Sequence, residues 1–335
     1  MDWSKTKNVL IMLLILANLI VGGLYVGLTG DKLYIPESAV ADAMENLASR
    51  GVEVSHNAIN EKKQGLPVYS AAMVDAEQIK ERLIDASRAF GEFDDEPVVI
   101  DVPDGISVSK HEENGGQKIY SATFTGTTTI EVSVDTNKDS TFRNSENSGI
   151  IDVLRSFVSP EVNLYAVPDG ENAPTSRETQ TAKSFYKALY DRNDYGRGKA
   201  DMGFRCYDVR NLGRGRAMCC VATADDIVIP ELKSVFWFGE DGKAVYAVGK
   251  FFVGGAKKAY STSLLDGIDV IYKMELSSVK RIVSQHDALS LVPVEGDSYY
   301  LIPSHSVVFE DKDGNLVNNI YDSVVGELKS SEIYG

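Results

Sequence analysis

The chain has 335 residues, of which 49 are acidic and 34 are basic, and its formal net charge is −15. Residues 1–30 contain Lys5, Lys7 and Asp2 and carry a net charge of +1, so the remaining chain carries about −16. This acidity excludes the extended basic face that nucleic-acid binding requires. The length allows one large hydrophobic core or two of average size.

The first predicted element is residues 8–30, an uncharged run of 23 residues between Lys7 and Asp31. A helix of that length would reach about 34 Å, enough to cross a hydrocarbon core of about 30 Å. Signal peptides have shorter apolar cores, and the Ala-x-Ala sequence at residues 39–41 lies beyond Asp31 inside an expected helix. We interpret the run as an uncleaved transmembrane helix, with a signal peptide as the alternative. The lysines before it predict a cytoplasmic tail, residues 1–7, a cell-membrane location and an extracytoplasmic remainder.

The predicted span also has features of helix–helix contact. Gly23 and Gly27 form a G-x-x-x-G pair, whose small residues let two helix backbones approach closely. Asn18 and Gly22 lie on a different side of the helix, about 120° away. Asn18 is an amide at membrane depth, and a neighbouring helix could supply its hydrogen-bond partner. We predict that the span binds other membrane helices; the alternative is a plain anchor, since glycines are common in membrane helices.

Beyond the span, the hydrophobic pattern predicts an α+β fold. Apolar spacing indicates helices near residues 36–50, 75–90, 150–157, 175–189 and 264–276, the fourth opened by a Thr175–Glu178 capping box. Turn sequences predict hairpins around Asn114, Gly242 and Gly314. Because helices alternate with groups of hairpins, we expect antiparallel sheets packed with helices. The matching order of elements predicts two similar exterior domains, residues 31–159 and 160–335.

The sequence contains no motif of a catalytic nucleophile, neither G-x-S-x-G nor H-E-x-x-H, so we do not expect an enzyme. The three cysteines are Cys206, Cys219 and Cys220. Cys206 could reach one of the other two across a hairpin, and buried free thiols are the alternative.

One loop resembles a calcium site. Asp135, Asn137, Asp139 and Glu146 fall at positions 1, 3, 5 and 12 of a calcium-binding loop. Ser140 stands where the sharp turn requires glycine, and a strand rather than a helix precedes the loop. A solvated loop is the competing interpretation, and we predict no metal or other cofactor.

A basic segment covers residues 192–216. It holds seven basic residues, Arg192, Arg197, Lys199, Arg205, Arg210, Arg214 and Arg216, and the acidic residues in it or directly before it are four, Asp191, Asp194, Asp201 and Asp208. It could meet an acidic partner or an anionic envelope polymer, or it could be an ordinary exposed hairpin.

Four stretches resemble known bacterial sequences. "MDWSKTK" running into one apolar span resembles the start of the YycI (WalI) family, regulatory proteins of low-GC Gram-positive bacteria. "ENLASRGVEV" and "QGLPVY" are similar to that family's first exterior segment. "YYLIPSHSVVFEDKDGNLVNNIYD" resembles the PepSY-type ends of exported bacterial proteins, consistent with an α+β exterior of YycH/YycI type.

The YycI resemblance implies a protein without enzymatic activity. With a YycH-like companion, it would join the sensor histidine kinase YycG (WalK), which governs cell-wall metabolism, through membrane helices and exterior domains. The residues that match the start of the family are Asp2, Trp3, Ser4, Lys5 and Lys7. Partner contacts of Asn18, Gly22, Gly23 and Gly27 rest on the helix argument alone. The alternative is an anchored envelope protein, either an enzyme or a PepSY-like peptidase inhibitor.

Overall fold

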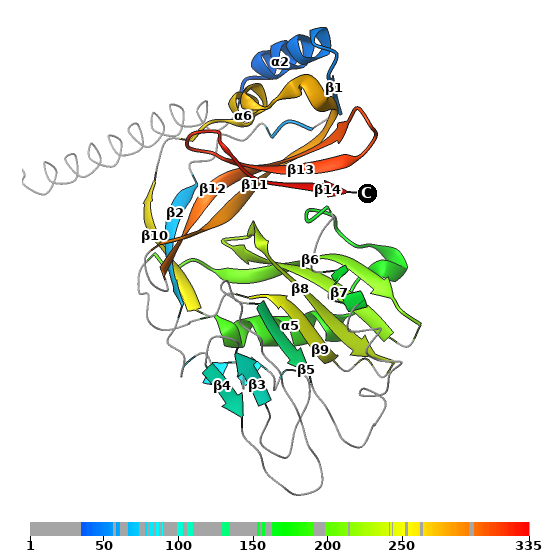
Figure 1. The fold of residues 1–335 in the computed structure, drawn as a ribbon, viewed down its shortest axis with the longest axis vertical. Helices are drawn as coiled ribbons and strands as arrows, with labels where there is room; N and C mark the ends of the chain where they lie inside the picture. The colour runs from blue at the N-terminus through cyan, green and yellow to red at the C-terminus, as the bar shows by residue number, and fades with distance from the viewer. Residues whose placement is uncertain are drawn as a thin grey trace, which may run out of the picture.

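A computed structural model of the chain shows a large mixed sheet with few helices (Figure 1). It describes residues 35–55, 58–60, 66–73, 78, 81–82, 85–86, 89, 99–102, 106–109, 129–133, 153–154, 156–157, 163–190, 198–213, 215–240, 242, 244–251, 254–261, 264–294 and 298–334. Among these residues, 12 strands form one sheet and two more form a separate hairpin, β3 (Val99–Val102) with β4 (Ile106–Ser109).

One part of the sheet, here called the C-terminal region, contains the longest strands. β11 (Val279–Pro293) and β12 (Ser298–Asp311) form a long antiparallel pair, which β13 (Leu316–Asp322) and β14 (Leu328–Tyr334) extend. β2 (Pro67–Met73) pairs with both β12 and β10 (Gly254–Ser261). β1 (Glu53–Val54) runs parallel to β11.

Two helices cover one end of this region (Figure 1). They are α2 (Glu37–Ser49) and α6 (Gly267–Lys273), and η3 (Leu276–Ser278) leads from α6 into β11. Val40 and Leu47 of α2 and Ile271 of α6 pack with Ile282 and Phe309 of the sheet in one buried cluster. Each such side chain contributes roughly 1.5–3 kcal/mol when fully buried, so this contact fixes the helices on the sheet.

The other part, here called the central region, consists of five antiparallel strands. These are β5 (Thr129–Ser133), β6 (Met202–Asn211), β7 (Gly215–Ala224), β8 (Ile227–Gly239) and β9 (Ala244–Lys250), in the order β6-β7-β8-β9-β5. β8 is buried over nearly its whole length because apolar clusters cover both faces: Phe236 and Phe238 face one, Val235 and Trp237 the other. A strand with both faces covered has a continuous apolar run in place of the two-residue alternation.

The two regions share a core although few backbone contacts join them. β8 and β11 meet in parallel at one residue pair, Val228 with Ala288. The cluster around Phe236 also includes Tyr69 of β2, Leu289 of β11 and Tyr299 of β12. Burial of these side chains therefore supplies most of the attachment between the regions.

Helix α5 (Ser176–Leu189) covers the central region, and the 3₁₀ turn η2 (Gly170–Asn172) precedes it. The predicted capping box is confirmed: Thr175 Oγ1 accepts the Glu178 N–H at 3.2 Å, and Glu178 Oε2 accepts the Thr175 N–H at 2.7 Å. Glu178 also lies 3.3 Å from the Arg216 guanidinium, which donates to the Ala173 carbonyl at 2.8 Å. The cap thus connects the start of α5 to β7.

Several sequence predictions match the observed elements. The predicted helix at 36–50 is α2, and the helix near 264–276 is α6 with η3. The hairpin around Gly314 is confirmed as β12 and β13, and the one around Gly242 as β8 and β9. The hairpin around Asn114 and most of the helix predicted at 75–90 lie outside the described residues.

The sheet differs from the antiparallel arrangement predicted, because β1 and β8 both run parallel to β11. Strands from residues 31–159 join strands from residues 160–335: β2 pairs with β10 and β12, and β5 pairs with β9. Each region therefore draws strands from both predicted segments.

No helix in the described ranges has the length and apolar character needed to cross a membrane, and the predicted span at residues 8–30 lies outside those ranges.

All three cysteines are free thiols. Cys206 on β6 lies opposite Cys220 on β7, and both belong to the α5 face of the sheet. Cys219 lies on the opposite face, because successive strand residues alternate. Of the two pairings considered from the sequence, only Cys206 with Cys220 shares a face.

The capping box yields a stability prediction. Thr175→Ala removes the acceptor for the Glu178 N–H, and we expect the free energy of unfolding to fall by about 1 kcal/mol in chemical denaturation. Thr179→Ala, an exposed position in the same helix, is the control and should leave stability within about 0.5 kcal/mol. An equal effect of the two changes would contradict a specific role for the cap.

Candidate functional site

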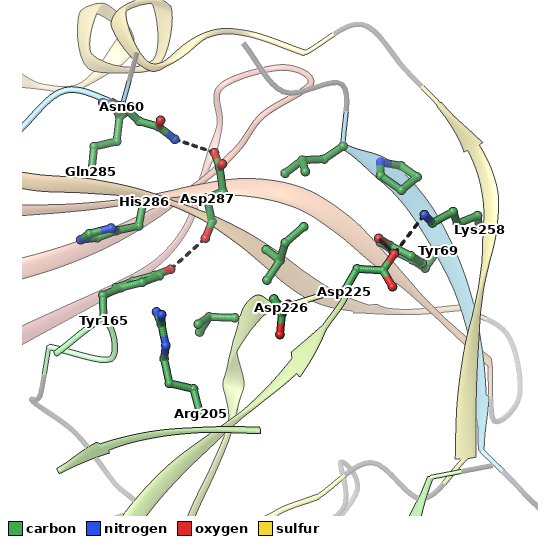
Figure 2. Close-up of a pocket in the computed structure, with 14 residues that line it drawn as sticks. Asn60, Tyr69, Tyr165, Arg205, Asp225, Asp226, Lys258, Gln285, His286 and Asp287 are labelled. Atoms are coloured by element: carbon green, nitrogen blue, oxygen red, sulfur yellow. Dashed lines mark hydrogen bonds and ion pairs between the residues drawn. The ribbon is translucent and has the colours of Figure 1, made fainter. Parts of the chain in front are cut away.

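A cavity of about 590 Å³ lies where the two sheet regions meet. Its walls come from the turn between β7 and β8, from the middle of β11, and from β2, β6 and β10 (Figure 2). The lining residues are Asn60, Leu66, Pro67, Tyr69, Tyr165, Arg205, Asp225, Asp226, Ile227, Val228, Lys258, Gln285, His286 and Asp287. This volume is within the range of natural small-molecule sites, which is roughly 300–1,000 Å³.

The β7–β8 turn places two carboxylates at the cavity. Ala224 pairs with Ile227 across the hairpin, so Asp225 and Asp226 form a two-residue turn. Their φ angles are 48° and 64°, both in the left-handed region. Such a type I′ turn usually contains Asn-Gly or Asp-Gly, because a side chain disfavours positive φ. Two residues with side chains in this conformation indicate a locally strained backbone at the cavity wall.

Hydrogen bonds to Asp225 hold this turn in place. Asp225 Oδ2 accepts the Tyr69 hydroxyl at 2.8 Å, and Oδ1 accepts the Asp201 N–H at 2.8 Å. The Lys258 ammonium lies 3.1 Å from Oδ2. The carboxylate therefore connects the turn to β2 and β10 of the C-terminal region.

The same contacts keep Asp225 ionised. Burial by itself raises the pKa of this carboxyl, but the hydrogen bonds from Asp201, Tyr69 and Lys258 outweigh burial and lower the pKa below its ordinary value. Burial, together with the neighbouring carboxylate, raises the pKa of the Tyr69 phenol far above its usual value. At neutral pH, Asp225 is charged and Tyr69 is a neutral donor.

The opposite wall is built on β11. The Tyr165 ring stacks on the His286 ring, with centroids 3.9 Å apart and planes 14° from parallel. The Tyr165 hydroxyl donates to the Asp287 carbonyl at 3.2 Å, and Asn60 Nδ2 donates to Asp287 Oδ1 at 2.9 Å (Figure 2). The Asn60 N–H donates to Gln285 Oε1 at 3.1 Å. These bonds fix the loop around Asn60 and the segment around Tyr165 against the strand.

His286 is neutral at physiological pH. Burial, reinforced by the charge of Arg205, lowers the pKa of its imidazole from 6.5 to about 4. A base with a pKa this far below neutrality removes protons weakly, because effective general bases have a pKa near the working pH. His286 therefore serves as a flat, neutral surface of the cavity.

The described residues hold no group of three or more His, Cys, Asp or Glu side chains placed to bind a metal ion. The calcium prediction for Asp135, Asn137, Asp139 and Glu146 falls outside those residues. The residues predicted to bind partners also fall outside them, namely Asp2, Trp3, Ser4, Lys5, Lys7, Asn18, Gly22, Gly23 and Gly27.

The described members of the predicted basic segment are dispersed. Arg205 lines the cavity, Arg210 pairs with Asp208 at 2.6 Å, and Arg216 pairs with Glu178 on the side of α5. Apart from Arg205, the sequence did not identify the charged residues of the cavity. The signal available was "ADDI", two carboxylates in a tight turn between apolar strands.

Comparisons with known proteins give no family. No protein-family model matches the sequence, and no curated protein matches it. The solved structure of the Bacillus megaterium YpeB C-terminal domain is 10% identical, with a TM-score of 0.28, over 39% of this chain and 57% of that chain. An uncharacterized protein from Eubacterium rectale is also 10% identical, with a TM-score of 0.43, over 83% of this chain and 89% of that chain. The chain thus covers little more than half of the YpeB domain, and neither likeness assigns a function.

The strained turn generates a mutational prediction. We expect Asp226→Gly to raise the free energy of unfolding by about 1 kcal/mol, because glycine adopts positive φ without strain. Asp225→Gly relieves the same strain but removes the contacts with Tyr69, Asp201 and Lys258, and should lower stability by about 2 kcal/mol. Chemical denaturation measures the free energy of unfolding of both variants. A lower value for Asp226→Gly than for the unmodified protein would show that the turn is not strained at this residue.

His286 generates a pH prediction. Between pH 4 and 6.5 the unfolded chain protonates this histidine while the folded chain does not, so acidification in this window favours unfolding. We expect His286→Phe, which keeps a ring against Tyr165, to show a smaller loss of stability from pH 6.5 to pH 4 than the unmodified protein. Tyr165→Phe is the control and should keep the original slope in denaturation curves recorded across that range.

Proposed function

We propose that this protein is a membrane-anchored extracytoplasmic accessory of a sensor histidine kinase of the YycG (WalK) type, which controls cell-wall metabolism. A YycH-like protein would be its companion. The observation that carries the proposal is the sequence "MDWSKTK" followed by an uncharged run of 23 residues with small and polar positions. An anchor alone requires neither the Gly23–Gly27 pair nor Asn18.

The cavity supports a binding role in preference to catalysis. Asp225 is committed to an ion pair and two hydrogen bonds, and burial and Arg205 hold the pKa of His286 at about 4. Neither group has the protonation behaviour of a general base at neutral pH. An exterior domain attached to a kinase-binding helix needs only to bind a ligand and, on binding it, to change its contacts with the kinase.

The mechanism would be a shift in the equilibrium between kinase states. The span of this protein would pack against the kinase helices better in one signalling state than in the other. A difference of about 1.4 kcal/mol in binding changes the ratio of two states tenfold. A modest change in helix packing is therefore sufficient for regulation.

The second candidate is an anchored envelope protein of the PepSY type, such as a peptidase inhibitor. The feature that favours it is the β12–β13 hairpin, formed by the stretch that resembles PepSY ends. In that case the exterior would act without specific contacts inside the membrane.

The helix contact can be tested in cells that contain the kinase. We expect the double change Gly23→Leu and Gly27→Leu in the full-length protein to shift kinase-dependent reporter expression toward the level of cells lacking the protein, because bulky side chains separate the helices. Ala17→Leu adds the same kind of bulk about 120° from the glycine strip and should have little effect. Equal reporter output from the unmodified protein, the double glycine variant and the Ala17→Leu variant, at equal protein levels, would refute helix-mediated regulation.

A further inference from the structure

Two side chains of opposite charge, Arg205 and Asp226, line the cavity. The Arg205 guanidinium comes from β6 and points toward the Tyr165–His286 pair, whereas Asp226 lies on the β7–β8 turn (Figure 2). Within the described part of the chain, neither side chain has a hydrogen bond or an ion pair to another residue. Both side chains remain available to a ligand.

The other charged groups of the cavity are already engaged. Asp225 is paired with Lys258 at 3.1 Å. Asp287 accepts a hydrogen bond from Asn60 at 2.9 Å and lies 3.7 Å from the buried His305 ring. A molecule that matches the two available charges therefore carries one anionic group, for Arg205, and one cationic group, for Asp226.

The strand register gives the distance between these charges. Arg205 pairs with Val221 on β7, and Asp226 follows Val221 by five residues, so the backbones of Arg205 and Asp226 are at most about 17 Å apart at 3.4 Å per residue. The arginine side chain shortens the distance to be bridged. An extended tripeptide spans about 10 Å, whereas the charged groups of a single amino acid are only a few ångströms apart.

The size and walls of the cavity fit the same class of molecule. At about 590 Å³, the cavity would be left mostly empty by one amino acid. Ile227 and Val228 offer apolar contact for side chains, and the stacked Tyr165 and His286 rings offer a flat surface. The left-handed turn holds the Asp226 backbone in a strained conformation, which is characteristic of ligand-contacting residues.

We propose that the cavity binds a short zwitterionic peptide of about three residues, with its carboxylate on Arg205 and its amino group on Asp226. An arginine can hold a carboxylate through two parallel hydrogen bonds, and an aspartate accepts charge-assisted hydrogen bonds from an ammonium group. The proposal concerns the exterior alone and stands independently of the kinase assignment.

Calorimetry with four related peptides tests the charge requirement on the full-length protein in detergent micelles. The probes are trialanine, its N-acetyl form, its C-terminal amide and the form blocked at both ends. We expect trialanine to bind tightest, loss of either charge to weaken binding about tenfold, and the doubly blocked peptide to bind weakest. Equal affinity for all four, or no binding of trialanine at millimolar concentration, would overturn the proposal.

Two variants assign each charge to its residue. Arg205→Gln should remove the preference for trialanine over its amide and keep the preference over the N-acetyl form. Asp226→Asn should do the reverse. Arg281→Gln is the control. Arg281 does not line the cavity and pairs with Glu310 at 2.7 Å, so this variant should keep both preferences. If both preferences survive in the Arg205 and Asp226 variants, whose melting curves confirm folding, the peptide binds elsewhere and the proposal fails.

Discussion

The carboxylate of Asp225 is the contact on which the geometry of the cavity depends. It lies on a turn whose two residues both have positive φ, and it receives hydrogen bonds from β2 and the Asp201 backbone and an ion pair from β10. Two hydrogen bonds to a charged group and one partly exposed ion pair can together offset the strain of such a turn. Asp225 thus joins the regions at the cavity, beside the pairing of Val228 with Ala288 and the backbone hydrogen bonds from Ala200 to Ala256 and from Lys258 to Gly198.

β11 links the cavity to the end of the sheet that α2 and α6 cover. Its first residues, Val279 and Ile282, pack under α2 and α6, while Gln285, His286 and Asp287 form the cavity wall. Gln285 donates to the Gly267 carbonyl at the start of α6 at 3.0 Å and also accepts the Asn60 N–H. Helix α2 begins shortly after the predicted span. A ligand that changes the β11 wall would therefore act on a strand that packs directly against α2.

Burial and hydrogen bonding shift the pKa values of two groups in the cavity, His286 and Asp225, below their ordinary values. Catalytic groups have pKa values tuned toward the working pH, whereas here burial lowers the pKa of His286 to about 4 and hydrogen bonding lowers the pKa of Asp225. Both groups therefore keep a single protonation state near neutrality. Such fixed charges and hydrogen bonds are consistent with the binding role proposed above.

The sequence by itself determined the local elements. The spacing of apolar residues predicted α2, α5 and α6, the Thr175–Glu178 pair predicted the start of α5, and turn residues predicted the β8–β9 and β12–β13 hairpins. These features depend on residues only a few positions apart, so a single sequence contains the whole signal. The acidic composition and the resemblance of the first residues can likewise be read from the sequence without any tertiary contact.

Only the tertiary structure decided the parallel pairings of β11, the sharing of strands between residues 31–159 and 160–335, and the cavity. Tyr69 reaches Asp225 across 156 residues, and Asn60 reaches Asp287 across 227. No local pattern specifies which distant strands meet, because that choice follows from burying the apolar faces of the whole chain at once. Arg205 and Asp226 could be recognised as charged surface residues from the sequence, but folding alone makes both line one cavity.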